Sequence, residues 1–329
     1  MFQKAPKPRW APITGPGNSE AINMMKLSIG PITYFWERQR VLDFYQQAAD
    51  CAAEIIYLGE VICSKRRLIK PEDWLAIGNE LRQNGKQVIL SSLTLLEAAS
   101  EMSSLKKLCR NDDFWVEAND ISAVQLLSTT GRSFVTGPSV NIYNSRSLKL
   151  LADKGLKRWV LPVELGLDTL KDLQSARPVG VETEVFALGR LPLAYSARCY
   201  TARSHNLPKD DCRFKCLDYP DGSLLKTREG QDFLILNGIQ TQSALTHQVL
   251  DKIPDLQALA VDVLRISPQS AHTMEIVDIF DNALKGAELN ALEEKLLSFL
   301  PLGPCNGYLI EQAGMQSGSE ATYETQQAS

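Results

Sequence analysis

The chain has 329 residues, of which 44% are hydrophobic and 22% charged, and its formal net charge is −4. This composition is typical of a globular protein with one large domain or two smaller ones, and it excludes a miniprotein that depends on disulfides. The mild negative charge disfavours binding through bulk charge to nucleic acid, so no nucleic-acid partner is expected. No apolar run approaches the roughly 18 residues of a membrane helix, and the N-terminus lacks a signal-peptide pattern. We therefore expect a cytoplasmic protein without a transmembrane segment.

Along the chain, short runs rich in Val, Ile and Leu alternate with amphipathic segments. Residues 1–24 are rich in proline and polar residues, which predicts a disordered extension. The polar residues 314–329 predict a disordered tail. Between them, the apolar runs are typical of strands buried on both faces. These runs are 26–32, 54–59, 86–92, 114–119, 132–138, 157–164, 183–189, 233–238 and 261–268.

Helical spacing of apolar residues occurs between the runs. It is visible in 36–53, 93–109 and 243–253, and in the first of these Val41, Leu42, Tyr45, Ala48 and Ala49 share one face. A further helix is expected to start at Asn144 and to stop at Gly155. Eight or nine alternations of strand and helix predict an α/β protein, and their number favours a (β/α)8-type barrel over residues 25–313. An open doubly wound sheet is the alternative, although no dinucleotide fingerprint or P-loop motif supports a nucleotide-binding version of it.

Three of the seven cysteines lie in one polar segment, residues 196–220. Cys199, Cys212 and Cys216 have the spacing C-x12-C-x3-C and follow the predicted strand 183–189, while Cys63 follows the predicted strand 54–59. The C-terminal ends of barrel strands share one face, so these four thiols can converge on one metal centre. Four thiolates suit zinc or an iron–sulfur cluster, and the absence of paired C-x2-C knuckles favours the cluster. Zinc, or no metal, remains the alternative. The other cysteines, Cys51, Cys109 and Cys305, are expected to be structural.

Arginines near the predicted strand ends are candidates for substrate binding. Arg198, Arg203 and Arg265 could hold a substrate carboxylate through paired hydrogen bonds. Structural pairing with glutamates of the predicted strands, Glu60, Glu117, Glu164 and Glu184, explains them equally well.

The histidines predict no catalytic pair. His205 lies in the cysteine segment without a residue to orient it towards a nucleophile. His247 falls on a predicted helix, and His272 begins another.

Several blocks of the sequence resemble the UbiV branch of the U32 peptidase-like family. They are "IYLGEVICSKRR", "GRLPLAYSARCYTARS", "PKDDCRFKC", "LNGIQTQS", "VLRISPQ" and "CNGY". The similarity extends from about Met25 to about Gly314. It implies a [4Fe–4S] cluster held by Cys63, Cys199, Cys212 and Cys216. Peptidase activity is not expected, because the sequence contains no convincing pair of nucleophile and base.

The resemblance also implies a function and partners. UbiV-like proteins act in ubiquinone biosynthesis without oxygen, as heterodimers with a UbiU-like paralogue that carries its own cluster. The pair hydroxylates the ring of the quinone precursor, with prephenate as the expected oxygen donor. A UbiT-like lipid-binding accessory protein holds the prenylated intermediate. Two alternatives remain open, namely hydroxylation of RNA bases, as in related U32 proteins, and a non-catalytic binding module stapled by zinc.

Overall fold

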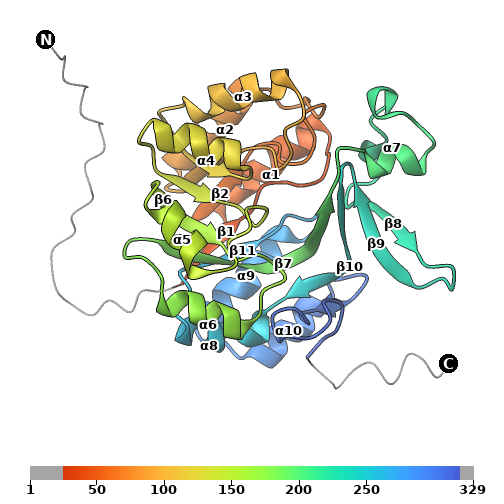
Figure 1. The fold of residues 1–329 in the computed structure, drawn as a ribbon. Coiled ribbons are helices and arrows are strands. Elements are labelled where there is room, and N and C mark those ends of the chain that lie inside the picture. Colours follow the sequence, from red (N-terminus) through yellow and green to blue (C-terminus); the bar gives the residue numbers. More distant parts are fainter. Residues whose placement is uncertain (1–24, 319–329) are drawn as a thin grey trace, which may run out of the picture.

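The computed structural model describes residues 25–318, and eight parallel strands in it form a closed barrel (Figure 1). Each strand pairs with its neighbours in parallel, and β11 closes the ring by pairing with both β1 and β7. The prediction of a (β/α)8-type barrel is therefore confirmed. The barrel strands are β1 (Lys26–Ile29), β2 (Ile55–Leu58), β3 (Gln87–Ser91), β4 (Trp115–Ala118), β5 (Phe134–Thr136), β6 (Leu156–Val160), β7 (Glu182–Tyr195) and β11 (Val263–Ile266).

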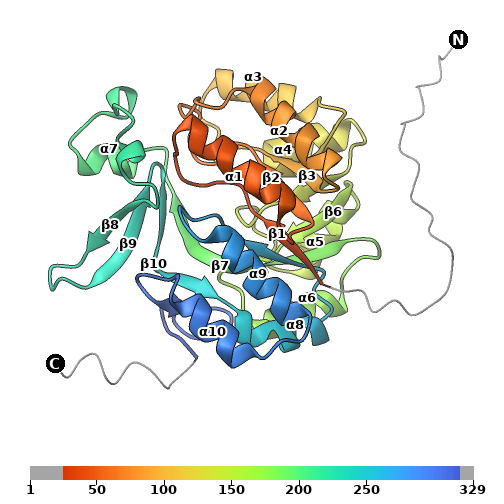
Figure 2. The same ribbon diagram turned by 180° about the vertical axis from the view of Figure 1, so that it is seen from behind.

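Apart from α7, the helices surround the barrel and cover its outer surface (Figures 1 and 2). None of the helices within residues 25–318 is long and apolar enough to cross a membrane. In chain order they are α1 (Arg38–Asp50), α2 (Pro71–Gln83), α3 (Ala99–Cys109), α4 (Ile121–Thr129), α5 (Ser145–Ala152), α6 (Leu167–Ser175), α7 (Tyr200–Ser204), α8 (Ile253–Ala258), α9 (Thr273–Leu284) and α10 (Leu289–Leu297).

Alternate residues of the strands face two different apolar layers. Ile55 and Tyr57 of β2 point into the barrel, where they pack with Ile89, Val135 and Val263. Ile56 and Leu58 belong instead to the large apolar core between the strands and the helices. Both layers are buried, which explains why β2 consists of buried aliphatic and aromatic residues throughout.

Local signals set the two ends of α5 as predicted. The Asn144 side chain caps α5 by accepting a hydrogen bond from the Ser147 amide at 2.9 Å. Gly155 follows that helix with a φ of +106°, a conformation that favours glycine. On α1, the face predicted from the sequence is buried, except that Leu42 is half-buried against the same core.

The chain leaves the barrel between β7 and β11. We call residues 196–239 the arm, because α7, β8 (Ser223–Lys226) and β9 (Asp232–Asn237) project beyond the barrel in Figures 1 and 2. Strand β10 (Gln240–Gln248) returns antiparallel to both β9 and the extended end of β7, and the short strand β12 (Pro304–Cys305) pairs with it.

Two sequence interpretations need correction in this region. The run 233–238 is a strand, β9, but it belongs to the antiparallel arm and not to the barrel. The predicted helix 243–253 is wrong over its first part, because residues up to Gln248 form β10; His247 is therefore on a strand. Hydrogen bonds to two flanking strands outweighed the helical spacing of apolar residues.

The predicted terminal segments lie mostly outside the described residues. Residues 1–24 and 319–329 fall there, whereas 314–318 of the predicted tail are described. The Gln316 carbonyl accepts hydrogen bonds from the amides of Asn306 and Gly307 at 3.0 and 2.9 Å. Residues 314–318 are thus hydrogen-bonded to the segment that follows β12.

The glycine after β2 provides a test of this geometry. Gly59 has a φ of +125°, and an added Cβ would lie 2.7 Å from the carbonyl oxygen of Ser91 on the neighbouring strand. We expect Gly59→Ala to lower the free energy of unfolding by about 2–4 kcal/mol, because backbone strain and a backbone clash add. Gly85→Ala is the matched control: Gly85 has a φ of +82°, but no atom would lie within 4 Å of its Cβ. Urea unfolding of both variants measures the difference, and equal losses would contradict the clash.

Candidate active site

The four predicted cysteine ligands lie in two segments at the C-terminal ends of barrel strands. Cys63 is in the loop after β2, and the other three are in the segment after β7. Cys199 caps α7, where its sulfur accepts a hydrogen bond from the Ala202 amide at 3.4 Å. All four thiols are free and half-buried. The structure thus places them on the face of the barrel where substrates of such folds bind.

Three of these thiols are close enough to influence one another. Cys63 and Cys199 both pack against one apolar group, formed by Val61, Ile62 and Ile239. Burial raises the pKa of the Cys63 thiol, and the neighbouring Cys199 adds to the rise. Burial likewise raises the pKa of Cys216, to which both Cys63 and Cys199 contribute. The segment after β7 therefore folds back onto the loop after β2.

Two lysines form hydrogen bonds between the cysteine segment and the loops at the ends of the barrel strands. Lys65 donates to the Asp210 carboxylate at 2.7 Å and to the Lys209 carbonyl at 2.9 Å. Lys209 in turn donates to Glu97, in the loop after β3, at 2.6 Å. The bond to Asp210 raises the pKa of Lys65, and the nearby Cys212 contributes to the same shift. Cys63 contributes to this shift as well, so both thiols lie within electrostatic reach of the Lys65 ammonium.

A buried guanidinium, that of Arg66, lies beside the thiols. It donates to the Thr33 carbonyl at 2.7 Å and to the Asn237 side chain at 2.8 Å, and it is 3.7 Å from Glu60. Its positive charge lowers the pKa of Cys216, although burial has the larger, opposite effect. Its Nε hydrogen has no acceptor among the described residues. Arg66 can therefore compensate negative charge at the thiol site.

The thiols do not form a site for one ion: within residues 25–318, no three His, Cys, Asp or Glu side chains are placed closely enough to hold one. An iron–sulfur cluster has a different requirement, since its cysteine sulfurs stand about 6–7 Å apart around the inorganic core. Four free thiols from two facing segments, with a buried cation beside them, have the donor chemistry that such a cluster requires.

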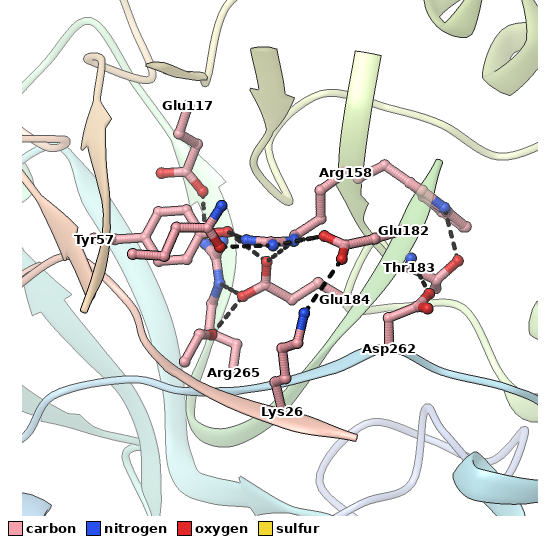
Figure 3. A network of polar contacts seen from close by, with 12 residues as sticks. Lys26, Tyr57, Glu117, Arg158, Glu182, Thr183, Glu184, Asp262 and Arg265 are labelled. Carbon is pink, nitrogen blue, oxygen red and sulfur yellow. Dashed lines mark hydrogen bonds and ion pairs between the residues drawn. The ribbon is translucent and has the colours of Figure 1, made fainter. Parts of the chain in front are cut away.

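Below this face, the barrel interior contains a network of buried charges (Figure 3). Glu184 of β7 accepts hydrogen bonds from the hydroxyls of Ser28 and Tyr57, both at 2.5 Å, and from Nε of Arg265 at 2.8 Å. Arg265 also pairs with Glu117 at 2.7 Å, and its guanidinium lies 4.0 Å from the centre of the Tyr57 ring. Five strands thus contribute side chains to one ionic group.

A second arginine completes the charge balance. Arg158 of β6 donates to Glu182 at 2.6 Å and approaches Glu184 to 4.0 Å. Burial disfavours the charged form of Glu184, yet Arg265 and Arg158 hold its pKa below the ordinary value. The carboxylate is therefore ionised and structural at neutral pH.

A cavity of about 490 Å³, counting the solvent at its mouth, lies directly above the network. Residues after β1, β2, β3, β4, β5 and β11 line it, and the extended β7 and β10 close one side. Val61 and Tyr195 belong both to this lining and to the apolar packing around Cys63 and Cys199. The cavity and the thiol group therefore share a wall. The charged and amide side chains of the lining are Glu117, Asn119, Arg190, Gln240, Gln242 and Arg265.

The structure separates the three predicted arginines. Arg265 lines the cavity, but it is 3% exposed and pairs with two glutamates, as the structural interpretation required. Arg198 and Arg203 are exposed on the cysteine segment and do not line the cavity. Sequence reasoning missed Arg190, which does line it. Its position directly after the predicted strand 183–189 was a usable signal.

The glutamates, histidines and remaining cysteines fall into simple roles. Glu117 and Glu184 are fully buried in the barrel, whereas Glu164 is exposed. His205 contacts the Tyr219 hydroxyl at 3.1 Å and the Thr201 carbonyl at 3.0 Å, so it is not paired with a cysteine. His272 immediately precedes α9, as predicted. Cys109 and Cys305 are buried, and Cys51 is half-buried at the end of α1.

A closed barrel with a polar cavity at its C-terminal face defines a (β/α)8-barrel protein of the class that carries enzyme active sites. The sequence pattern of one family, described as peptidase family U32, matches residues 37–318. The chain therefore belongs to the U32 family.

Solved structures give weaker similarities. A U32 peptidase is 11% identical with a TM-score of 0.42, over 79% of this chain and 98% of that one. N-acetylneuraminate lyase from Fusobacterium nucleatum, in complex with pyruvate, is 11% identical with a TM-score of 0.45, over 83% and 79%. A dihydrodipicolinate synthetase-like protein from Pseudomonas aeruginosa is 7% identical with a TM-score of 0.45, over 84% and 82%. At these scores, none of them carries an argument about the site.

The buried carboxylate of Glu184 yields a prediction about stability. We expect Glu184→Gln to lower the free energy of unfolding at about pH 7 by about 3–5 kcal/mol, because two buried arginines lose a common counter-charge. The lowered pKa of Glu184 stabilises the native state above the ordinary value of 4.5, and this contribution is lost as the pH falls through the native pKa. The difference between variant and wild type should therefore shrink in acid.

Urea unfolding at about pH 7 and about pH 4 measures both effects. Glu164→Gln is the matched control, since Glu164 is exposed and should change stability by less than about 1 kcal/mol. A loss for Glu184→Gln no larger than that of the control would refute the structural role of the ionic group.

Proposed function

We propose that this chain is a UbiV-like, iron–sulfur subunit of a hydroxylase that acts on the ring of a ubiquinone precursor without molecular oxygen. One observation supports the proposal: Cys63 and Cys199 pack against the same apolar group after the barrel strands β2 and β7, and Cys212 and Cys216 follow Cys199 in the same segment. The sequence blocks around these cysteines support it, because they resemble the UbiV branch. A cytoplasmic location belongs to the same proposal.

Cys63, Cys199, Cys212 and Cys216 would hold a [4Fe–4S] cluster, which supplies one-electron redox chemistry when bound. The chain's own residues have separate tasks. Arg66 compensates the charge of the thiolates, and Lys65 holds the cysteine segment against the barrel through Asp210. Val61 and Tyr195 lie between the thiols and the cavity, so the thiol group and the cavity are neighbours separated by these two side chains.

The reaction and its partners complete the proposal. Hydroxylation without oxygen gas requires another source of the oxygen atom, and we assign this role to prephenate on the basis of the resemblance. A UbiU-like paralogue forms the second subunit, and a UbiT-like lipid-binding protein presents the prenylated ring. The cavity beside the thiols is the place at which this chain would take part in the chemistry.

The cysteine variants test the ligand assignment. We expect Cys63→Ala and Cys212→Ala to abolish iron and sulfide in anaerobically purified protein, because each removes one of four ligands. Cys51→Ala and Cys109→Ala are the matched controls. Both should retain iron, and each should lower the free energy of unfolding by about 1 kcal/mol through lost core packing. Zinc in place of iron and sulfide in the wild-type protein would favour a zinc-stapled module and reject the cluster.

The same variants test the function in cells. Ubiquinone formed without oxygen should disappear in cells that carry Cys63→Ala or Cys212→Ala, while ubiquinone formed in air persists. Normal anaerobic ubiquinone in these cells would exclude a required cluster. Loss of the quinone in air as well would point to a general role in folding or biosynthesis.

The partner gives a further prediction. We expect this chain and the UbiU-like paralogue, purified together without air, to sediment as one heterodimer at micromolar concentration. A specific interface of that strength buries at least about 1,000 Å². Two independent monomers in the mixture would remove the heterodimer from the proposal.

A further inference from the structure

A continuous series of buried hydrogen bonds connects the thiol site with the cavity. It begins at Arg66, whose Nη2 donates to Oδ1 of Asn237 at 2.8 Å. Nδ2 of Asn237 donates to Oε1 of Gln240 at 3.2 Å, and Nε2 of Gln240 donates to the Tyr195 hydroxyl at 2.9 Å. Arg66, Asn237 and Gln240 are 5%, 2% and 1% exposed, so these bonds lie away from bulk water. We call these four residues the relay.

The direction of every bond in the relay is determined by the chemistry of its partners. A guanidinium group has only donors, so Asn237 must turn its oxygen towards Arg66. The Thr33 carbonyl, which can only accept, lies 2.8 Å from Nδ2 of Asn237 and requires the same orientation. Gln240 then has to present its oxygen to Asn237, and its amide nitrogen is left for Tyr195. The Tyr195 oxygen is therefore an acceptor in this series.

Tyr195 is the member of the relay that lines the cavity. Its oxygen accepts from Gln240, and no side chain or carbonyl within residues 25–318 accepts its hydrogen. Burial raises the pKa of Tyr195 above the ordinary value, so the phenol is protonated at neutral pH. The hydroxyl hydrogen is therefore available to a molecule in the cavity.

Arg66, at the other end of the relay, lies beside the thiols. Burial opposes its charged form, yet Glu60, followed by Cys216 and Cys63, raises the pKa of Arg66 above the ordinary value. The guanidinium is therefore always charged. A fixed positive charge polarises a series of hydrogen bonds that leads away from it, and buried bonds of this kind strengthen one another. The hydroxyl at the far end becomes a stronger donor as a result.

We infer that Tyr195 is a catalytic residue that donates a hydrogen bond to a molecule in the cavity. Asn237 and Gln240 are positioning residues, through which Arg66 fixes the direction of that bond. A hydroxyl held as a donor stabilises negative charge that develops on an oxygen atom of a reacting molecule. The catalytic role of Tyr195 rests on the proposed function, whereas the polarity of the relay does not.

Ultraviolet resonance Raman spectra of the full chain, purified without air, test the polarity. The two bands of the tyrosine doublet change their relative intensity according to whether the phenol oxygen accepts or donates a hydrogen bond. The chain has nine tyrosines, so each spectrum is compared with that of the same protein carrying Tyr195→Phe. In the wild type we expect the difference to show an accepting phenol. Gln240→Met removes the donor at similar length and should abolish this signal.

Asn237→Asp tests whether the direction is transmitted along the relay. The new carboxylate still accepts from Arg66, but it offers no donor to Gln240, whose amide must then turn its nitrogen towards it. The Gln240 oxygen would face Tyr195, so the Raman signal should change to that of a donating phenol. Asn290→Asp is the matched control, because it adds the same charge at an exposed position of α10 and should leave the signal unchanged.

The Raman outcomes decide the polarity by themselves. A donating phenol in the wild type overturns the inference. An unchanged signal in both Asn237→Asp and Gln240→Met, in protein that still melts cooperatively, overturns it too. If Asn237→Asp does not fold, Gln240→Met alone decides.

Anaerobic ubiquinone formation tests the catalytic role. We expect Tyr195→Phe to lower its rate at least about tenfold, as for the loss of one hydrogen bond in the transition state, while iron and sulfide stay at the wild-type level. Normal anaerobic ubiquinone in these cells overturns the catalytic role. Normal anaerobic ubiquinone with Cys63→Ala rejects the proposed function instead, and an accepting Raman signal still supports the relay in that case.

Discussion

The carboxylate of Glu184 links five strands of the barrel. Ser28, Tyr57, Arg158 and Arg265 reach it from β1, β2, β6 and β11, and it extends from β7 itself. A charge at this depth is tolerated only when it is paired and fully hydrogen-bonded, so the group fixes the relative register of these strands. Figure 3 shows the carboxylates and guanidinium groups of this network alternating across the barrel interior. The two ion pairs of Arg265 set its orientation at the floor of the cavity.

The upper part of the site depends on the length of β7. This strand continues to Tyr195, well beyond the barrel, and pairs there with β10. The extension carries Arg190 and Tyr195 over the cavity and delivers Cys199 to the loop after β2. One strand therefore builds a wall of the cavity on one side and one edge of the thiol group on the other.

The local pattern of the sequence determined most of the scaffold. Eight of the nine apolar runs are barrel strands, because a strand buried on both faces needs an apolar side chain at nearly every position. The cap at Asn144 and the stop at Gly155 are likewise readable, since both act within one turn of the helix. The grouping of the cysteine segment with Cys63 on one face followed from strand order alone.

Contacts between distant segments decided the rest. The strand β10 resembled a helix, because its partners β7 and β9 and their hydrogen bonds are invisible in its own residues. Arg265 is bound to Glu117, 148 residues away, and this pairing depends on the closure of the barrel. Arg190, Thr33 and Gln242 meet in one cavity only because β1, β7 and β10 converge at its mouth. A sequence pattern indicates whether a residue is buried or exposed. Which partner a buried polar group binds is determined by the tertiary structure.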